Sequence, residues 1–453
     1  MEMTLPRLTR LTAGVLPATT AVLLVSAASA QARAGGGSGG FGGGGRGGGG
    51  HGGGFFVFYF LFSHPILLVL VAVAIVGSML FSAAQSARYR ARRQARVRRV
   101  ELAAAEASED DPAFAPDAVR ERAAALFRAI QLAWDRRDRT GLADLVGPDL
   151  LVEWHRRLDD FERRGWHNRV AVAAGPAVEY VGLVNREDDR DDRTVVRVEA
   201  VLRDYVQDRA GRRIARNDSE TDTRELAEYW TLGKHERDGS WMLLSIEQRA
   251  EGDHQLDEGL VATPWGDTER LHDEALVEGA AADKLPAGVT TAEVASVGYE
   301  DDARAAALDL SLADGRFAPA VLEVAVRRAI AAWAEAVDGS DRDLAALASP
   351  AALRELLHPG DASGRTRLVV RGPRLLEVTI VDLDANVEPP RMTIAFAAEG
   401  RRYVEDRDTT VVVSGNPSTP TRFSERWTFA LDGPDENPWR IVDAAASATP
   451  QRA

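Results

Sequence analysis

Hydrophobic positions from residue 113 to residue 250 follow a helical period first and a strand period afterwards. Leu126, Phe127, Ile130 and Trp134 recur every three or four residues, which predicts a helix with one buried face. Gly147-Pro148 then breaks the pattern, and two shorter helices are expected around this break. Runs rich in β-branched and aromatic residues follow and predict strands at 178–184, 195–202, 225–234 and 241–248.

The same succession of patterns returns about 198 positions further along the chain. Helices are expected again at 320–337, 341–348 and 350–357, before strands around 375–383, 391–398, 409–413, 423–431 and 439–444. Short motifs keep their order and spacing in both halves, which predicts two tandem copies of one domain. The motif pairs are Arg203-Asp204-Tyr205-Val206 with Arg401-Arg402-Tyr403-Val404, Glu228-Tyr229-Trp230 with Glu425-Arg426-Trp427, Trp134 with Trp333, and Trp241 with Trp439.

Helices followed by antiparallel strands indicate the α+β class, in which the helices of each copy pack on one face of a curved antiparallel sheet. In 195–202, apolar Val196 and Val198 alternate with Arg197 and Glu199, which predicts a sheet with one face in water. The first copy is expected at 113–250 and the second, more divergent copy at 290–447. An acidic linker at 251–289 joins them, and 448–453 form a tail.

The segments that precede the copies have a different character. Two arginines and an apolar stretch end at Ala28-Ser29-Ala30, which indicates a signal peptide at 1–30 that is either cleaved or kept as an anchor. Residues 31–54 are almost all glycine and predict an unfolded leader. Residues 55–84 contain no Asp, Glu, Lys or Arg and are long enough to cross a bilayer as one helix.

A basic juxtamembrane helix and linker are expected at 85–112. Seven arginines lie close to the predicted span, namely Arg88, Arg90, Arg92, Arg93, Arg96, Arg98 and Arg99. The positive-inside bias places this end at the cytoplasmic face, where arginines attract anionic lipid. We therefore expect a single-pass protein of the plasma membrane, with its N-terminus outside and both copies in the cytoplasm. The reverse topology would make it an extracytoplasmic ligand-binding protein.

The net charge of −14 is unevenly distributed. Residues 1–100 carry eleven arginines and a single acid, so the acidic excess lies in the rest of the chain. An acidic body is repelled by nucleic acid and by anionic lipid. Nucleic acid is therefore not expected as a partner, and contacts with membrane lipid are expected at the span and the arginines.

Few residues of this chain suggest catalysis. Cysteine is absent, which excludes disulfides and thiolate chemistry, and the eight histidines show no metal-binding spacing. We expect no metal, no cofactor and no catalytic residue. The alternative is a small-molecule isomerase or cyclase in one copy, with Tyr205 beside Asp204 and Asp208 as the candidate site. The structural alternative for Tyr205 is a hydrogen-bonded residue that seals the core.

Aromatic residues at matching positions are candidates for a pocket wall or a core in each copy. They are Trp134, Tyr205, Trp230, Trp241, Trp333, Tyr403, Trp427 and Trp439. A second aromatic and basic set occurs only in the first copy, and comprises Trp154, Trp166, Arg156, Arg157, Arg163 and Arg164. This face is expected either to dock on lipid headgroups or to lie in solvent, with ion pairs to Asp159, Asp160 and Glu162.

Motifs of the first copy resemble the family of the mitochondrial inner-membrane translocase subunit 44 and its bacterial relatives. They are Asp111-Pro112-Ala113-Phe114, Ile130-Gln131-Leu132-Ala133-Trp134 and Gly147-Pro148-Asp149-Leu150, behind an arginine-rich segment and a glycine-rich leader. The second copy matches more loosely, with Ala331 in place of Gln131. The resemblance implies a bacterial, membrane-anchored member with two cone-shaped domains of the nuclear transport factor 2 type, each with a large apolar pocket.

The resemblance also implies a binding role. The mitochondrial member scaffolds a protein import motor, and bacterial relatives are regarded as lipid-binding proteins. We therefore expect a non-catalytic scaffold that holds a lipid, an apolar ligand or a protein partner at the cytoplasmic membrane surface, with a link to protein translocation.

Overall fold

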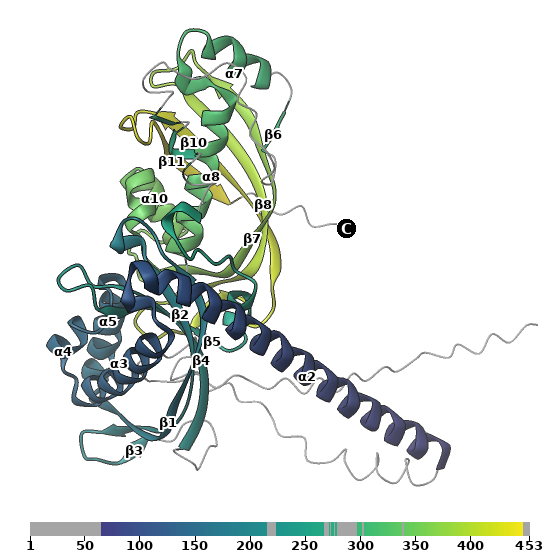
Figure 1. Cartoon of the computed structure of the whole chain (residues 1–453), viewed down its shortest axis with the longest axis vertical. Coiled ribbons are helices and arrows are strands. Elements are labelled where there is room, and N and C mark those ends of the chain that lie inside the picture. The colour runs from purple at the N-terminus through teal and green to yellow at the C-terminus, as the bar shows by residue number, and fades with distance from the viewer. Residues whose placement is uncertain are drawn as a thin grey trace, which may run out of the picture.

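The computed structural model describes residues 65–214, 223–266, 297–300, 303–337 and 339–446, together with parts of 271–278 (Figure 1). The predicted signal peptide, the glycine-rich leader, the first ten residues of the predicted span and the tail lie outside these residues.

Three helices precede an antiparallel sheet in the first copy. The helices are α3 (Pro116–Arg136), α4 (Arg139–Ala143) and α5 (Pro148–Arg164), after the short turn η1 (Pro112–Phe114). The strands are β1 (Trp166–Val184), β2 (Arg193–Asp208), β3 (Arg213–Ile214), β4 (Thr223–Lys234) and β5 (Trp241–Gln248), with the turn η2 (Asp189–Asp191) between β1 and β2. Strands pair in the order β1-β2-β4-β5, and β3 pairs with β2.

The second copy repeats this plan. Its helices are α8 (Pro319–Ala336), α9 (Arg342–Leu347) and α10 (Pro350–Leu357), after η5 (Gly315–Phe317). Its strands are β7 (Thr366–Asp384), β8 (Arg391–Asp406), β9 (Val412–Gly415), β10 (Thr421–Leu431) and β11 (Trp439–Ala446). The additional elements β6 (Gly298–Tyr299) and α7 (Ala303–Ser311) precede it, and β6 pairs with β7 in parallel. The predicted α+β class, with helices before an antiparallel sheet in each half, is confirmed.

The first long strand of each copy extends further than the sequence predicted. β1 begins at Trp166 and β7 at Thr366, each about ten residues before the predicted start. A Gly-Pro pair interrupts the β-branched run in both strands, at Gly175-Pro176 and at Gly372-Pro373. The pairing with the next strand shifts register around these pairs, so that each strand bends without leaving the sheet.

A single helix, α2 (Pro65–Asp110), covers both the second part of the predicted span and most of the basic segment. Its C-terminal half belongs to the first copy, because Val100, Ala104 and Ala107 lie in the same buried cluster as α3 and the sheet. The core of the first copy thus begins before residue 113. In the part of the chain that the structure describes, no helix is long and apolar enough to cross a membrane. The span at 55–84 stays a prediction.

Helix α2 also covers the outer face of the first sheet, together with the turn η3 (Gly252–Leu256) (Figure 1). The hydroxyl groups of Tyr89 on α2 and Tyr229 on β4 lie 2.8 Å apart. Arg197, expected in water, is 1% exposed and binds Glu199 at 2.5 Å. The expectation of a wet face is therefore wrong at this position, since a buried arginine is tolerated when a carboxylate pairs with it.

Replacing Ala104 by leucine is expected to lower the free energy of unfolding by about 1–3 kcal/mol, because Ala104 is fully buried and the added atoms must displace packed neighbours. The matched control on the same helix is Leu102→Ala, where the native side chain is 76% exposed and the change should stay within about 0.5 kcal/mol. Thermal unfolding of the full chain in detergent micelles measures both. Equal effects at the two positions would contradict the assignment of α2 to the core.

Candidate functional site: the joint between the two copies

Seven of the eight aromatic residues proposed for a pocket wall or a core are buried, each at most 3% exposed. One of the seven, Tyr403, also lines the cavity between the copies that is described below. Trp333 packs edge-on against Trp427, with ring centres 5.7 Å apart. In the first copy, the indole of Trp134 donates a hydrogen bond of 2.8 Å to Asn168 and packs edge-on against Trp154. Such edge-to-face contacts stabilise a core. The contacts match most closely at Trp241 and Trp439, which pack edge-on against Phe114 and Phe317 respectively.

The eighth residue, Tyr205, is half-buried, and the guanidinium of Arg213 covers its ring at 4.6 Å. Asp204 and Asp208, the two acids proposed to act with Tyr205, make other contacts. Asp204 is buried and accepts a hydrogen bond from Asn168, whereas Asp208 caps a turn by accepting the backbone N–H groups of Ala210 and Arg212. The structure does not bring the three side chains together at one site.

Three of the seven arginines after the predicted span bind the first copy itself. Arg92 pairs with Asp257, and Arg93 lies 3.0 Å from Glu179. Arg96 is buried and donates to the backbone carbonyls of Val181 and Glu258. The other four, at Arg88, Arg90, Arg98 and Arg99, are exposed. Part of the arginine segment therefore holds α2 on the sheet.

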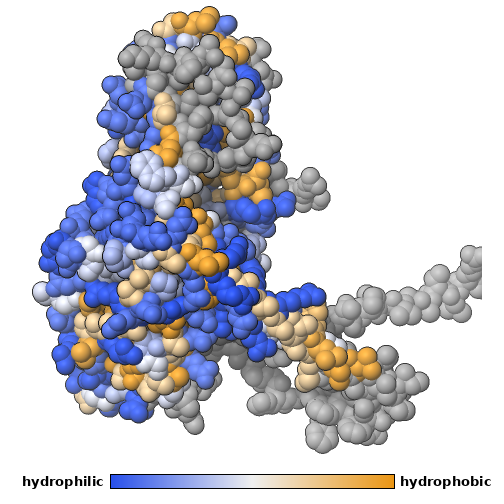
Figure 2. Space-filling model, viewed as in Figure 1, coloured by the Kyte–Doolittle hydropathy of each residue, from blue (hydrophilic) through white to orange (hydrophobic). Residues whose placement is uncertain are grey.

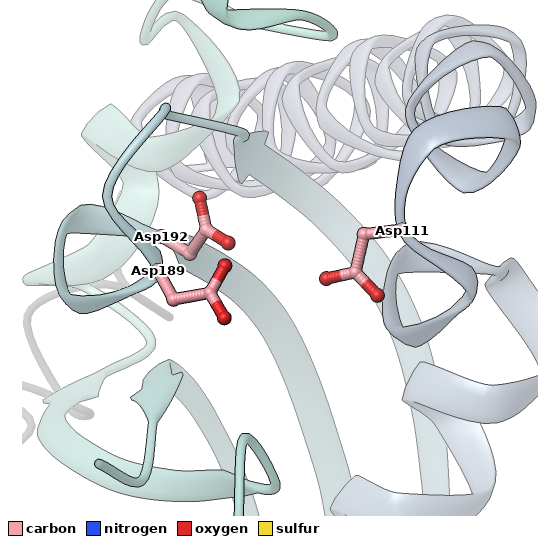
Figure 3. Close-up of side chains that lie close together, drawn as sticks. All are labelled: Asp111, Asp189 and Asp192. Carbon is pink, nitrogen blue, oxygen red and sulfur yellow. The ribbon is translucent and has the colours of Figure 1, made fainter.

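Three carboxylates gather at the end of α2 in the arrangement of a metal site (Figure 3). They belong to Asp111, Asp189 and Asp192. The ammonium group of Lys234 lies among them, 2.8 Å from Asp189 and 2.7 Å from Asp192. Although burial opposes it, hydrogen bonding to these aspartates raises the pKa of Lys234 above its ordinary value. Lys234 supplies the positive charge that the carboxylates require, and the cluster fastens the end of α2 to the sheet.

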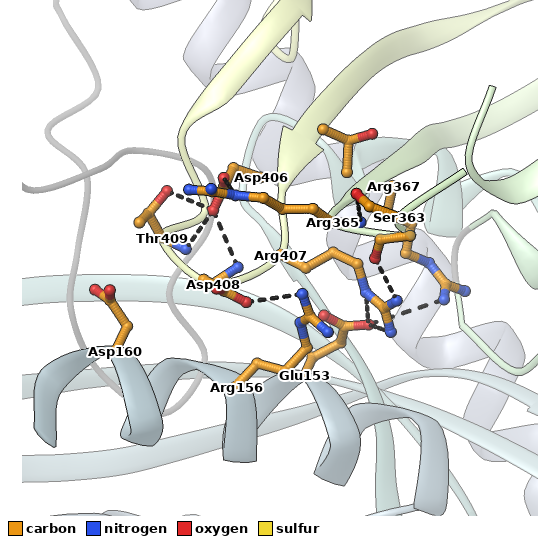
Figure 4. Close-up of polar contacts among 12 residues, drawn as sticks. Glu153, Arg156, Asp160, Ser363, Arg365, Arg367, Asp406, Arg407, Asp408 and Thr409 are labelled. Carbon is orange, nitrogen blue, oxygen red and sulfur yellow. Dashed lines mark hydrogen bonds and ion pairs between the residues drawn. The ribbon is translucent and has the colours of Figure 1, made fainter. Parts of the chain in front are cut away.

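The basic face of α5 docks on the second copy (Figure 4). Arg156 lies 2.9 Å from Asp408 and Arg163 lies 3.2 Å from the same carboxylate. Next to them, Glu153 of α5 binds Arg407 at 2.6 Å, and both side chains are mostly buried. The alternative expectation, in which this face forms ion pairs with acids of its own helix, holds in part, because Arg163 and Arg164 both pair with Asp160. Much of the α5 face that was expected to dock on lipid headgroups therefore contacts protein.

Next to these ion pairs, the two copies line a partly open cavity of about 90 Å³. Its lining combines α5 and β5 of the first copy with β7 and β8 of the second. Arg371 on β7 donates to the hydroxyl of Ser245 and to the carbonyl of Ile246, both at 3.3 Å. Arg157 and Glu405 also line this cavity, and their opposite charges attract each other. Burial lowers the pKa of Arg157 and raises the pKa of Glu405.

The turn η3 connects the joint to α2. Its neighbour Glu251 is buried, accepts a hydrogen bond of 3.4 Å from Tyr403 of the second copy, and has a pKa that burial raises. His254 of η3 lies 2.8 Å from Glu247, and although burial opposes it, this carboxylate raises the pKa of His254 to about 9. The same His254 ring packs against Gly372 on β7, where a Cβ atom would lie 2.6 Å from the ring. The residues after β5, predicted as the start of a linker, thus form part of the joint.

Charged residues of the joint occupy positions at which the two copies have different residues. Arg371 and Glu405 on the second sheet correspond in register to Ala171 and Gln207 on the first. Helix α5 has 17 residues and its counterpart α10 only eight, so the second copy has no helical equivalent of Arg156 or Arg157. Sequence reasoning singled out these arginines because they lack counterparts. It missed Arg371 and Glu405, which look like ordinary solvent-facing strand residues.

A glutamate also lies beside a buried tryptophan in each copy, as the repeated Glu-x-Trp motif indicates. Glu228 accepts the indole N–H of Trp230 at 3.1 Å. In the second copy, Glu425 instead binds Arg402 at 2.9 Å, and burial raises the pKa of Glu425 to about 7 despite this partner.

Comparison with known proteins shows which domain family the two copies match. The sequence model of the Tim44-like domain matches residues 100–248 and 304–446. Its first match begins at Val100, within α2, where the core of the first copy also begins. Among solved structures, the chain is similar to an NTF2-like protein involved in plasmid conjugation, with 9% identity, a TM-score of 0.15, and coverage of 62% of this chain and 78% of that one. No curated protein sequence matches this chain.

Substituting Glu153 by glutamine is expected to destabilise the joint by about 2–4 kcal/mol, because Arg407 would keep its charge at a mostly buried position without its carboxylate. Amide hydrogen exchange in β8 measures this, since protection there reports opening of the joint. Asp432→Asn is the control, because its pair with Arg440 is more exposed and worth at most about 1 kcal/mol. Unchanged exchange in Glu153→Gln would show that the pair does not hold the copies together.

The melting temperature is expected to fall as the pH rises from about 4.5 to about 7, in part through Glu425. The pKa of Glu425 is higher in the folded chain than in the unfolded chain, so the folded chain binds this proton more tightly. The stabilisation is complete below the pKa of the unfolded chain and is lost as the pH rises to the pKa of the folded chain. Glu425→Gln, which stays neutral, should flatten this part of the profile. Melting curves of both proteins between pH 4 and 8.5 measure the difference, and parallel profiles would contradict the assignment.

Proposed function

Because the chain belongs to the Tim44-like domain family, we propose that it is a membrane-anchored, non-catalytic scaffold. Its two domains, of the nuclear transport factor 2-like type, would be presented together at the cytoplasmic membrane surface, where they bind a protein partner or lipid. In this proposal the anchor is the predicted span, and a link to protein translocation follows from the family alone.

The observation that carries this proposal is the course of α2. Where α2 projects from the body, large apolar side chains are exposed along it (Figure 2). They are Val73, Val76, Met79, Leu80 and Phe81. Exposed apolar surface of this kind is typical of a segment that meets a membrane or another protein. The same helix continues without a break into the core of the first copy.

A continuous helix fixes distance as well as orientation. From the end of the predicted span at Ala84 to Tyr89, the first residue bound to the sheet, the helix rises about 8 Å at 1.5 Å per residue. The first copy would therefore lie directly against the bilayer surface. Because the ion pairs of the joint attach the second copy to the first, the tandem would move with the anchor as one body.

The acidic body and the absence of an assembled Tyr205 site support a binding role for the described part of the chain. One observation favours the alternative, an isomerase or cyclase in one domain. Glu425 is a buried carboxyl group whose pKa of about 7 suits a general acid or base at neutral pH. Its ion pair with Arg402 is the competing structural explanation.

Topology gives the decisive test of the proposed arrangement. Green fluorescent protein fused to the C-terminus should fluoresce, and alkaline phosphatase at the same position should be inactive, because the positive-inside bias keeps this end in the cytoplasm. Fusions after Gly54 are the control and should give the reverse result. Active phosphatase at the C-terminus would contradict the cytoplasmic scaffold and favour an extracytoplasmic ligand-binding protein.

A further inference from the structure

Helix α2 has one face on the first sheet and the opposite face in solvent. Tyr89 and Arg96 mark the inner face, where they bind the sheet seven residues apart. Along the outer face, small and apolar residues recur at alternating steps of four and three residues, which is the heptad spacing of a coiled-coil seam. We term this stripe the α2 seam, and it runs through Val73, Gly77, Leu80, Ala84, Ala87 and Ala91, all of which are exposed.

The α2 seam continues past the predicted span. Gln94, Arg98, Glu101 and Ala105 follow at the same steps, so the repeat covers residues 73–105, which is more than four heptads. A heptad repeat of this length is typical of a helix that pairs with another helix of the same period. A bilayer or a flat protein surface does not require that period. The seam therefore indicates a helical partner.

The outer face of α2 is also less polar than its place on the molecule explains. Leu80 is 67% exposed on the seam, and Leu102 is 76% exposed beside it. A helix that buries only one face normally has charged and polar residues on the other. Small residues such as Gly77 and Ala91 also allow two helices to approach closely. Both features favour a second helix on this face.

The two charged residues of the seam make it complementary to itself. Arg98 and Glu101 have opposite signs and occupy consecutive seam positions. In two identical parallel helices, Arg98 of one molecule lies next to Glu101 of the other, about 4.5 Å further along the axis. Glu101 also binds Arg120 of its own molecule, and a carboxylate has acceptor sites for both arginines. The seam thus suits a second molecule of this protein.

We propose that two molecules of the protein pair through the α2 seam as a parallel two-stranded coiled coil, which brings four Tim44-like domains together. Because Tyr89 and Arg96 hold each sheet on the inner face of its helix, the two bodies lie on opposite sides of the pair (Figure 1). The parallel direction rests on the proposed anchor, since two chains anchored in one membrane with the same topology run the same way.

The first test is disulfide cross-linking of the full chain in isolated membranes, with copper phenanthroline as the oxidant. The native chain has no cysteine, so a single introduced cysteine reports on one position. Ala84→Cys, Ala87→Cys and Ala91→Cys should each give a disulfide-linked dimer, because seam residues of paired helices face each other and a disulfide requires Cα atoms within about 7 Å.

Gln85→Cys and Ser86→Cys are the matched controls for this test. Both positions are exposed on the same turns of α2 but lie outside the seam, and they should give no dimer. Equal cross-linking at seam and control positions, or no cross-linking at the three seam positions, would overturn the proposal.

The second test measures the mass of the full chain in detergent by light scattering. The native protein should have the mass of two chains, and Ala91→Glu should halve it, because two like charges would meet in the seam. Gln85→Glu adds the same charge outside the seam and should keep the mass of two chains. Both positions are exposed, and circular dichroism reports whether each variant is folded. A dimer that Ala91→Glu leaves intact would contradict pairing through the seam.

Extraction of the membranes with alkaline carbonate separates this proposal from the proposed anchor. A native chain that stays in the membrane but shows no seam cross-links contradicts the coiled coil and leaves the anchor in place. A chain that carbonate releases contradicts the anchor, and the contrast between Ala91→Cys and Ser86→Cys still decides whether the helices pair.

Discussion

Buried charged side chains attach the parts of this protein to one another, because each needs an opposite charge or a set of backbone acceptors where it leaves water. Arg197 is buried beneath α2 with Glu199, Arg96 reaches two backbone carbonyls, and Lys234 lies among three aspartates. An unpaired charge at such positions would cost several kcal/mol. Helix α2 can therefore cover the outer face of the first sheet only in the register that satisfies these groups.

The two copies share their apolar cores and differ in their charges. Trp230 and Trp427 lie at equivalent positions of the two sheets and are both fully buried, whereas Arg371 and Glu405 have neutral residues in their place on the first sheet. A docking surface repeated identically in both copies could add further copies without limit. Because the second copy lacks the part of the helix that carries Arg156 and Arg157, it does not offer the same surface to a further copy.

Helix α2, the turn η3 and the joint form one connected path through the molecule. Tyr89 and Val97 of α2 pack with Leu256 of η3, His254 of the same turn packs on Gly372 of the second sheet, and Glu251 binds Tyr403. The turn η3 and the residue before it thus contact both α2 and the second copy. The cavity between the two copies lies beside this path, among groups that only the assembled tandem brings together.

The amino-acid sequence by itself determined the tandem plan, the order of helices before strands and the tryptophans of the two cores, because hydrophobic periodicity and repeated motifs are local signals. It could not determine that Arg197 is buried, that α2 belongs to the first core, or that Glu153 meets Arg407 across 254 positions. Those outcomes depend on which faces two folded copies and a helix bury against each other. A charged residue that alternates with apolar ones looks the same in the sequence whether its face meets water or another domain, and only the tertiary structure distinguishes the two.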